Sequence, residues 1–231
     1  MPAPQSVILA AGMGTRLGRP WPKPLTRLAD GRSIMQQQID NVRTAFGDDA
    51  PILIVVGFKL ELILEEHPDV LFAYNEAYDQ TNTNRSLLRA LRLGQPGGVL
   101  WMNGDVVFDP AVLSRVESLV GEDRSFVCVN TAAVAEEEVK YTVDADGFIA
   151  SLSKQVAEPL GESVGINFVS SMDRADLIAG LAACEDGDYF ERGIEYAIER
   201  SRTRFLPVDI SDLFAVEVDF DEDLTRANAG L

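Results

Sequence analysis

The chain is poor in the residues that build disulfides, zinc sites and histidine-based catalysis. Its 231 residues include two cysteines and one histidine. Cys128 and Cys184 are far apart and lack ligand spacing, and His67 precedes Pro68 at the end of a predicted helix. A disulfide framework, a zinc centre and a Ser/His/Asp triad are therefore not expected.

Long hydrophobic runs are also missing. The apolar stretches, such as ILIVVGF at 52–58, are the size of a strand and too short to span a bilayer. The opening MPAPQS has no basic residue before VILAA, unlike a secretory signal peptide. We expect a cytoplasmic protein without a membrane partner.

Positive charge is scarce. Twenty Lys and Arg face 37 Asp and Glu, which gives a formal net charge of −17. A surface with this much negative charge repels nucleic acid, and no nucleic-acid partner is therefore expected. Anionic substrates would require the few cations to gather at one place, and the lysines are only Lys23, Lys59, Lys140 and Lys154.

Strand-like and helical patterns alternate over the first 130 residues. Buried strands are predicted at Ser6–Ala10, Ile52–Gly57, Val70–Tyr74, Val99–Asn103 and Ser125–Asn130, and helices at Ile34–Phe46, Leu60–Glu66, Arg85–Leu93 and Pro110–Val120. This order predicts an α/β fold with a mostly parallel, mixed sheet and helices on both faces.

The alternation of strand and helix patterns ends after residue 135. Short strands are predicted at Lys140–Val143, Phe148–Ser153 and Val164–Val169, helices at Asp173–Cys184 and Tyr189–Ser201, further strands at Arg204–Val208 and Leu213–Val218, and a last helix from Asp221. The first two strands form a small β insertion with a turn at 146–147. Because no Pro/Gly linker interrupts the chain, a single domain over 1–231 is predicted.

The most informative segment is VILAAGMGTRLGRPWPKPL at 7–25. Small residues after a buried strand let backbone N–H groups approach phosphate oxygens, and Arg16 and Lys23 add two cations. A Walker A loop would need Gly-Lys-Ser/Thr, and a dinucleotide fingerprint would need a third glycine where Leu17 stands. The prolines that follow forbid a helix, so the pattern indicates an extended loop over a phosphate chain.

This segment resembles the L-A-A-G-x-G-[ST]-R…P-K signature of the nucleoside-diphosphate-sugar pyrophosphorylase superfamily, and the resemblance implies a Rossmann-like nucleotidyltransferase fold. It implies that Arg16 and Lys23 neutralise the triphosphate and act as catalytic groups. The nucleotide would be lined by Leu9, Ala10, Ala11, Gly12, Gly14, Thr15, Asn103 and Gly104.

Two acids are candidates for a Mg²⁺ site. Asp105 follows the strand Val99–Asn103, at the sheet edge where ligands bind in open α/β sheets. The segment AVEVDFDEDLTRANA resembles the closing pattern of the same superfamily, which implies Asp219 as the second ligand, with Glu217 on the same strand face. Asp109 and the acids at 221–223 are interpreted as helix caps.

Acceptor recognition is assigned to two segments. NEAYDQTNTNRSLLRAL resembles the cytidylyltransferase branch that includes phosphocholine and phosphonate cytidylyltransferases, which implies nucleotide contacts from Asn82 and Thr83 and acceptor contacts from Asn84 and Arg85. The alternative interpretation of the same residues is structural, as a helix cap and a turn.

The second segment, SLSKQVAEPLGESVGINFVS, places Lys154 after a predicted strand, where it could hold a phosphate or phosphonate. The resemblance implies that the rest of the acceptor pocket is lined by Glu162, Gly165 and Asn167. Residues 189–191 fit either a cationic acceptor head or the core of a helix, and the core is the favoured interpretation.

The resemblance implies a Mg²⁺-dependent enzyme that transfers CMP from CTP to a small phosphorylated or phosphonylated acceptor and releases pyrophosphate. Two alternatives stay open, a sugar-1-phosphate nucleotidyltransferase that uses dTTP or UTP and a non-catalytic nucleotide sensor. The sequence names neither the acceptor nor the oligomeric state, and a homodimer is left open.

Overall fold

A mixed sheet of nine strands organises the molecule. The computed structural model describes residues 3–132, 134–135 and 137–230, except for the side chain of Thr15. The main path of the sheet runs in the order β10-β6-β9-β4-β1-β2-β3. Its strands are β1 (Gln5–Ala10), β2 (Ile52–Val56), β3 (Leu71–Tyr74), β4 (Val99–Asn103), β6 (Phe126–Asn130), β9 (Gly161–Val169) and β10 (Leu206–Asp209).

Most neighbours on this path are parallel, and β9 runs antiparallel to both β4 and β6. The hairpin of β7 (Lys140–Val143) and β8 (Ile149–Ser153) attaches to β9 through β7. Its turn uses Gly147 at φ +84°, and Asp144 accepts hydrogen bonds from the backbone N–H groups of Asp146 and Phe148. The mostly parallel, mixed sheet is thus confirmed, and the predicted β insertion is this hairpin.

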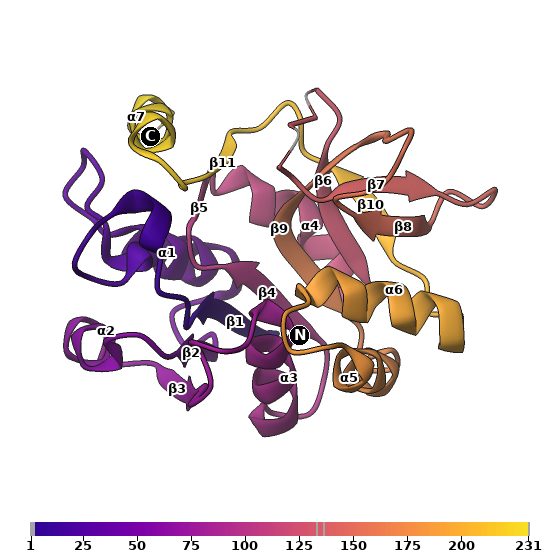
Figure 1. The fold of residues 1–231 in the computed structure, drawn as a ribbon, viewed down its shortest axis with the longest axis horizontal. Coiled ribbons are helices and arrows are strands. Elements are labelled where there is room, and N and C mark those ends of the chain that lie inside the picture. Colours follow the sequence, from indigo (N-terminus) through magenta and orange to yellow (C-terminus); the bar gives the residue numbers. More distant parts are fainter. Residues whose placement is uncertain (1–2, 133, 136, 231) are drawn as a thin grey trace.

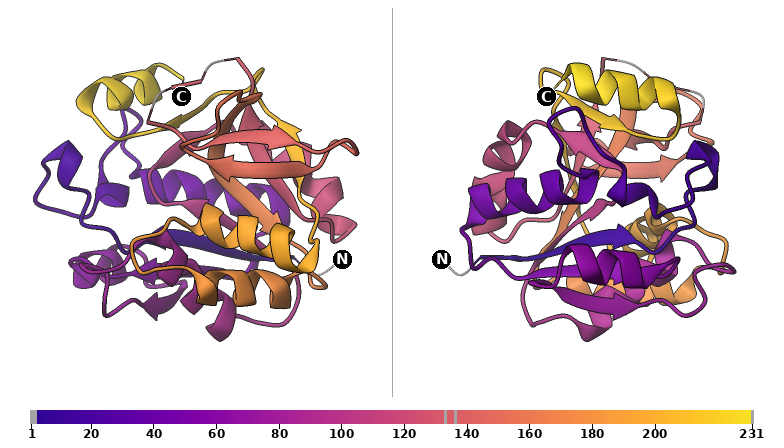
Figure 2. Two further views of the ribbon diagram at one scale, coloured as in Figure 1. Left: turned by 45° about the vertical axis from the view of Figure 1, so that its right-hand side comes forward. Right: turned by 90° about the vertical axis from the view of Figure 1, so that its left-hand side faces the viewer.

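Helices cover both faces of the sheet, as the alternating patterns predict (Figures 1 and 2). One face carries α1 (Ile34–Phe46), α2 (Leu60–Glu66) and α4 (Ala111–Gly121), and the other carries α3 (Thr83–Leu93), α5 (Arg174–Ala183) and α6 (Phe190–Ser201). Strand β1 shows why both faces are apolar, since Val7 and Leu9 enter one core and Ile8 and Ala10 the other.

Both ends of α1 have caps formed by neighbouring residues. The Ser33 hydroxyl accepts a hydrogen bond from the backbone N–H of Gln36 at 3.2 Å, and Gly47 ends the helix at φ +97°. Helix α3 begins at Thr83, two residues before its predicted start. The reason is that the Asn82 side chain accepts from the N–H of Thr83 at 2.8 Å and so acts as the cap.

One strand pair was not predicted. Strand β5 (Val106–Phe108) pairs antiparallel with β11 (Ala215–Glu217), and α7 (Asp221–Ala229) follows β11 directly. A small apolar core of its own supports this unit, with Val107, Val216, Val218 and Ala227 buried together. In Figures 1 and 2 the unit lies above the main sheet.

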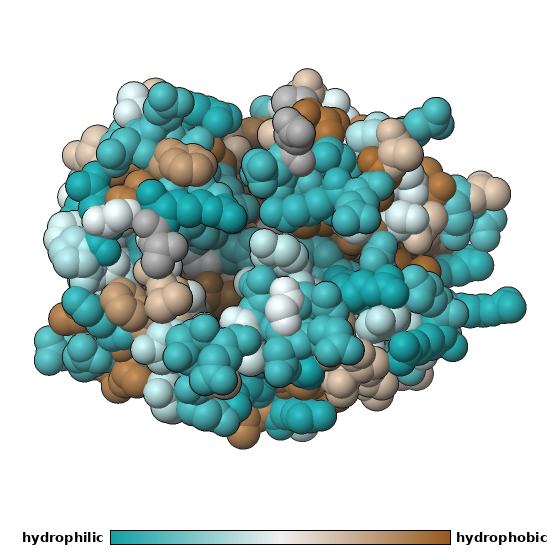
Figure 3. Space-filling model, viewed as in Figure 1, coloured by the Kyte–Doolittle hydropathy of each residue, from teal (hydrophilic) through white to brown (hydrophobic). Residues whose placement is uncertain are grey.

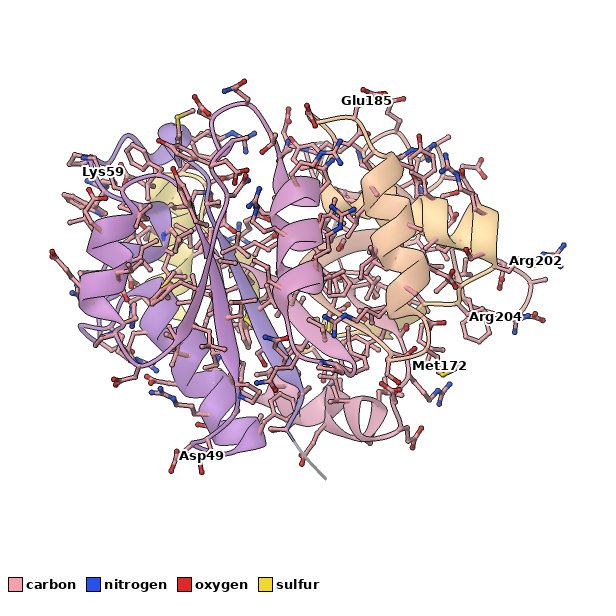
Figure 4. All side chains as sticks on the ribbon, turned by 90° about the horizontal axis from the view of Figure 1, so that it is seen from below. Asp49, Lys59, Met172, Glu185, Arg202 and Arg204 are labelled. Atoms are coloured by element: carbon pink, nitrogen blue, oxygen red, sulfur yellow. The ribbon has the colours of Figure 1, made fainter. Side chains whose placement is uncertain are left out.

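The carboxyl ends of the parallel strands meet at one edge of the sheet. In Figure 4, Asp49, which precedes β2, lies at the bottom, and Lys59, which follows β2, lies at the top. Glu185, in the loop between α5 and α6, lies at the same upper edge. Ligands of open α/β sheets bind at such an edge. Among the helices of the described chain, none has the length and apolar character to cross a membrane.

Candidate active site

A buried lysine occupies the centre of this edge. Lys23 lies in a short 3₁₀ turn, η2 (Lys23–Leu25), and is 8% exposed. Its Nζ lies 2.7 Å from Oδ2 of Asp105 and 2.5 Å from Oδ1 of Asp219. Burial alone would lower the pKa of Lys23, but the two carboxylates outweigh burial and raise that pKa above its ordinary value. The ammonium group therefore stays charged between the two acids.

Arg16 adds a second cation to the same acids. It lies in the 3₁₀ turn η1 (Thr15–Leu17), and its Nη1 is 2.6 Å from Oδ2 of Asp219. The Arg16 side chain is 53% exposed, so it is open to solvent on the side away from Asp219. Residues 203 positions apart in the sequence thus share one ionic cluster.

The unpredicted β5–β11 pair explains how Asp105 and Asp219 meet. Glu217 lies opposite Val106 in the ladder, and the N–H of Val218 donates to the carbonyl oxygen of Asp105 at 2.9 Å. Asp105 therefore stands at one end of the pair, and Asp219 follows directly at the same end. Pairing of the two strands fixes the separation of the two carboxylates.

Three acids at this point form a ligand set suited to a hard cation. Carboxylate oxygens of Asp105, Glu217 and Asp219 lie within 4.8 Å of one another. Oδ1 of Asp105 is buried and has no hydrogen-bond partner in the described structure. The charge of Asp105, together with burial, raises the pKa of Glu217 well above its ordinary value. Lys23 and Arg16 are two cations facing three carboxyl groups, and clustered carboxylate oxygens are what Mg²⁺ prefers, so the residues fit that ion.

The loop after β1 needs glycine at two positions for different reasons. Gly14 has φ +59°, and a Cβ there would lie 2.9 Å from Cβ of Lys23. Gly12 has no heavy atom within 4 Å of such a Cβ, so its space is open toward solvent. Gly14 thus lets the loop pass close to Lys23, while Gly12 leaves bare backbone facing the pocket.

These groups line a pocket of about 300 Å³. It opens on the face shown in Figure 3, where hydrophilic side chains predominate. Thirteen of the residues that the sequence assigns to the site line it: Leu9, Ala10, Gly12, Gly14, Arg16, Lys23, Thr83, Asn103, Gly104, Asp105, Lys154, Gly165 and Asp219. Glu217, named above for its place on the strand face of Asp219, lines it as well.

Other assigned residues do not line the pocket. Ala11 is buried, and its carbonyl oxygen accepts from the N–H of Phe58 at 3.1 Å. Asn167 is fully buried on β9, and Glu162 accepts from the N–H of Ala135 at 2.9 Å. The side chain of Thr15 lies outside the described residues.

The start of α3 differs most from the interpretation above. The Asn84 side chain is buried and donates to the carbonyl oxygen of Glu185 at 2.6 Å. Arg85 pairs with Asp186 at 2.8 Å and donates to the carbonyl of Cys184, and Asn82 donates to the carbonyl of Gly187. These side chains face the α5–α6 loop because that loop has free carbonyl groups to satisfy. The side chains of Asn82, Asn84 and Arg85 therefore connect the start of α3 to the α5–α6 loop. They are not among the residues that line the pocket, whereas Thr83 is.

Residues 189–191, at the start of α6, are only partly helix core, which is their favoured interpretation from the sequence. Phe190 belongs to the core and packs edge-on against Trp101, with ring centroids 5.7 Å apart. Tyr189 is 40% exposed and Glu191 is 6% exposed, and both line the pocket. Burial raises the pKa of Glu191 to about 7. Phe190 thus fits the favoured interpretation as helix core, while Tyr189 and Glu191 lie where the other interpretation, contact with an acceptor, requires them.

A second group of lining residues was not singled out from the sequence. Pro24, Glu137, Glu138, Val139 and Ser163 all line the pocket. The two glutamates belong to the run of acids at 136–138, of which Glu136 lies outside the described residues. Such a run in a loop is normally a solvated surface, so only the fold reveals that it borders a site.

Comparison with known proteins identifies the family. A family model described as the MobA-like NTP transferase domain matches residues 6–187. The chain belongs to this family of NTP transferases. The match contains the loop after β1, Lys23 and Asp105, while Asp219 lies beyond it.

Known relatives and solved structures agree with the family assignment. The chain is similar to the CMP-5'-(3-aminopropyl)phosphonate synthase of Streptomyces rubellomurinus, with 36% identity over 122 residues, which is 48% of this chain and 19% of that protein. The curated relatives that it matches are therefore much longer, and the match spans about a fifth of their length.

Two solved structures share the fold over nearly the whole chain. The inositol-1-phosphate CTP transferase of T. maritima has a TM-score of 0.78 at 15% identity, covering 100% of this chain and 98% of that one. The CTP:phosphocholine cytidylyltransferase of Streptococcus pneumoniae has a TM-score of 0.75 at 17% identity, covering 98% of both chains. These likenesses show that the chain has the nucleotidyltransferase fold.

Proposed function

We propose that the protein is a CTP-dependent cytidylyltransferase that transfers CMP to a small phosphorylated or phosphonylated acceptor. The observation that carries the proposal is the ionic cluster of Lys23, Arg16, Asp105 and Asp219, which lies in one pocket beside a glycine-lined backbone. The family supports nucleotidyl transfer. The choice of CTP is supported by the resemblance of residues 75–91 to cytidylyltransferases and by the names of the relatives that use it.

The reaction fits groups that position and neutralise charge. An oxygen of the acceptor's phosphate or phosphonate attacks the α-phosphorus of CTP. The bond from that phosphorus to the bridging oxygen breaks, and the electron pair leaves with pyrophosphate. Because the attacking oxygen is already anionic, no general base is required. In this proposal Lys23 and Arg16 neutralise the triphosphate and the leaving pyrophosphate.

Asp105, Glu217 and Asp219 would hold the Mg²⁺ ion. When bound, such an ion supplies positive charge that lowers the repulsion between the triphosphate and the anionic acceptor. Lys23 then has a double role. It compensates the acids in the free protein, and it donates to phosphate oxygens when the nucleotide is present.

Release of pyrophosphate tests the proposal directly. We would measure it for CTP, UTP, dTTP and ATP, each with an aminoalkylphosphonate, phosphocholine and glucose 1-phosphate, in Mg²⁺ and in EDTA. CTP with a phosphonate or phosphate monoester should give turnover that EDTA abolishes. Lys23→Ala should lower that turnover by about 100-fold or more while the fold persists. Binding of CTP without pyrophosphate release for any acceptor would instead indicate a nucleotide sensor.

A further inference from the structure

The turn that carries Asp105 is held by one side chain of α1. Gln38 is fully buried, and its Nε2 donates to the carbonyl oxygens of Asn103 and Val106, each at 2.8 Å. These two carbonyl groups lie on either side of Gly104 and Asp105, between the end of β4 and the start of β5. A primary amide has two N–H donors, and both donors of Gln38 are therefore used on this turn.

Strand β5 needs these donors because, in the described chain, its sheet consists of β5 and β11 alone. The carbonyl oxygens of a strand point alternately to its two edges, and those of Val106 and Phe108 accept hydrogen bonds from α1. Gln37 donates to the carbonyl of Phe108 at 2.6 Å, and Asn41 donates to the same oxygen at 2.9 Å. Amide side chains of α1 thus take the place of a second neighbouring strand, since buried carbonyl groups require donors.

The hydrogen bonds of Gln38 act on the end of β5 that joins Asp105. The backbone carbonyl of Asp105 accepts from the N–H of Val218 at 2.9 Å. Of its carboxylate oxygens, Oδ2 contacts Lys23, and Oδ1 is buried without a partner in the described structure. The direction of the carboxylate therefore depends on the backbone of the turn. Because Gly104 has no side chain to restrict that backbone, the turn requires hydrogen bonds from outside to stay in place.

We propose that Gln38 is a positioning residue for the cation site, which keeps the carboxylate of Asp105 within reach of an ion shared with Glu217 and Asp219. The inference rests on the proposed function, because it assigns the support of the same Mg²⁺ ligands. Gln38 is not part of the described lining of the pocket, so it acts through Asp105 and not on the substrate. A displacement of about 1 Å at such a site is costly, because the ion requires all its ligands at once.

Gln38→Met tests the inference, because methionine keeps the length of the side chain and removes both donors. We would measure bound CTP by equilibrium dialysis while the Mg²⁺ concentration is raised, always in excess over CTP. The Mg²⁺ concentration for half-maximal binding should rise by about 10- to 100-fold, which is the usual effect of removing a group that supports metal ligands. The affinity for CTP in EDTA should match that of the unaltered protein.

The matched control is the double variant Gln37→Met/Asn41→Leu. Both residues are buried on the same helix as Gln38, and their side chains donate to the opposite end of the same strand. The control removes two hydrogen bonds, as Gln38→Met does, and keeps those of the turn at Asp105. It should lose a similar amount of stability and yet keep the Mg²⁺ requirement of the unaltered protein.

Pyrophosphate release gives a second readout. Turnover of Gln38→Met should be low at limiting Mg²⁺ and should recover at saturating Mg²⁺, because the ligand is displaced and not lost. A purely structural defect would lower turnover equally at every Mg²⁺ concentration. Should Gln38→Met not fold, as circular dichroism would show, Gln38→Glu replaces it, since glutamate keeps the shape and at most one donor. Its Mg²⁺ requirement should be raised as well.

The outcomes separate this inference from the proposed function. An unchanged Mg²⁺ requirement in the folded Gln38 variant, or an equal rise in the double variant, overturns the role of Gln38 while nucleotidyl transfer stands. Binding of CTP that depends on Mg²⁺, without pyrophosphate release for any acceptor, overturns the proposed function and leaves Gln38 as the support of the cation site. Binding of CTP that Mg²⁺ does not strengthen in the unaltered protein overturns the cation site and this inference together.

Discussion

At the scale of single residues, the site depends on Lys23, whose ammonium group lies where the three acids concentrate negative charge. Lys23→Ala should therefore destabilise the free protein, by roughly 3 kcal/mol, because Asp105 and Asp219 lose their buried partner. Mg²⁺ should restore much of that loss, since the vacated position suits a cation. Urea unfolding with EDTA and with Mg²⁺ measures both effects.

The control for this prediction is Lys59→Ala, which removes an exposed lysine. It should show the same small response to Mg²⁺ as the unaltered protein. If Mg²⁺ stabilised Lys23→Ala no more than the unaltered protein, the ion would not take the position that Lys23 vacates, and if it stabilised neither protein, the three acids would not form a cation site.

Glu191 gives a pH-dependent prediction. Burial raises its pKa to about 7 in the folded protein, against an ordinary value of 4.5. Between these values the folded state holds a proton that the unfolded state releases, so this group reduces stability as the pH rises from about 4.5 to 7. Glu191→Gln cannot ionise and should escape the loss, becoming more stable than the unaltered protein at pH 8, by up to about 3 kcal/mol.

Urea unfolding across pH 4.5 to 8.5 measures the difference between the two proteins. Other groups with raised pKa values, such as Glu138 and Glu217, are present in both and largely cancel. Glu199→Gln, a change at an exposed residue of the same helix, should follow the unaltered protein throughout. Parallel stability curves for Glu191→Gln and the unaltered protein would show that Glu191 is ionised normally in the fold.

At the scale of elements, the loop after β1 separates a structural glycine from one that leaves room for a ligand. Gly14→Ala should destabilise the free protein by about 1 kcal/mol or more, since φ is +59° and Lys23 is in the way. Gly12→Ala should leave stability within about 0.5 kcal/mol, because its Cβ meets open space. It should weaken CTP binding by about tenfold, which is about 1.4 kcal/mol.

Thermal unfolding of the free variants and calorimetry with CTP and Mg²⁺ distinguish the two glycines. The pair serves as its own control, because both substitutions add one methyl group to the same loop. Equal loss of stability in both variants would contradict the open space at Gly12, and unchanged CTP affinity of Gly12→Ala would show that this space has no role in ligand binding.

The helices and strands also show which structural features a local sequence pattern can predict. Caps and strands set by local chemistry, such as Ser33 and the turn at Gly147, are predictable because the signals lie within a few residues. The β5–β11 pair is different. Each strand has three residues, and their pairing spans more than a hundred positions, so its stability comes from tertiary packing. Only the resemblance, not any local pattern, pointed to Asp219 as a partner of Asp105.

At the scale of the whole molecule, one side of the pocket is built from segments that meet only after folding. Glu138 comes from the loop before β7, Lys154 from the end of β8 and Glu191 from α6. Each separately has an ordinary explanation, as a solvated loop acid, a surface lysine or a residue in a helical first turn. Their common place beside one pocket is visible only when the hairpin and α6 are arranged in the fold.

Single-domain behaviour stays a prediction, and nucleotide binding tests it. The pocket takes residues from β1, β4, β9, α3, α6 and the β11–α7 junction, so a bound nucleotide should stabilise all of them together. At CTP and Mg²⁺ concentrations about 100 times the dissociation constant, the gain is about 2.7 kcal/mol. For a chain of this size that corresponds to a rise in Tm of roughly 5–10 °C. Calorimetry should show one transition that shifts as a unit, more for CTP than for UTP, dTTP or ATP, and little for Lys23→Ala. Two transitions of which only one moves would divide the chain into separately folding parts, because ligand stabilises only the unit that contains its site.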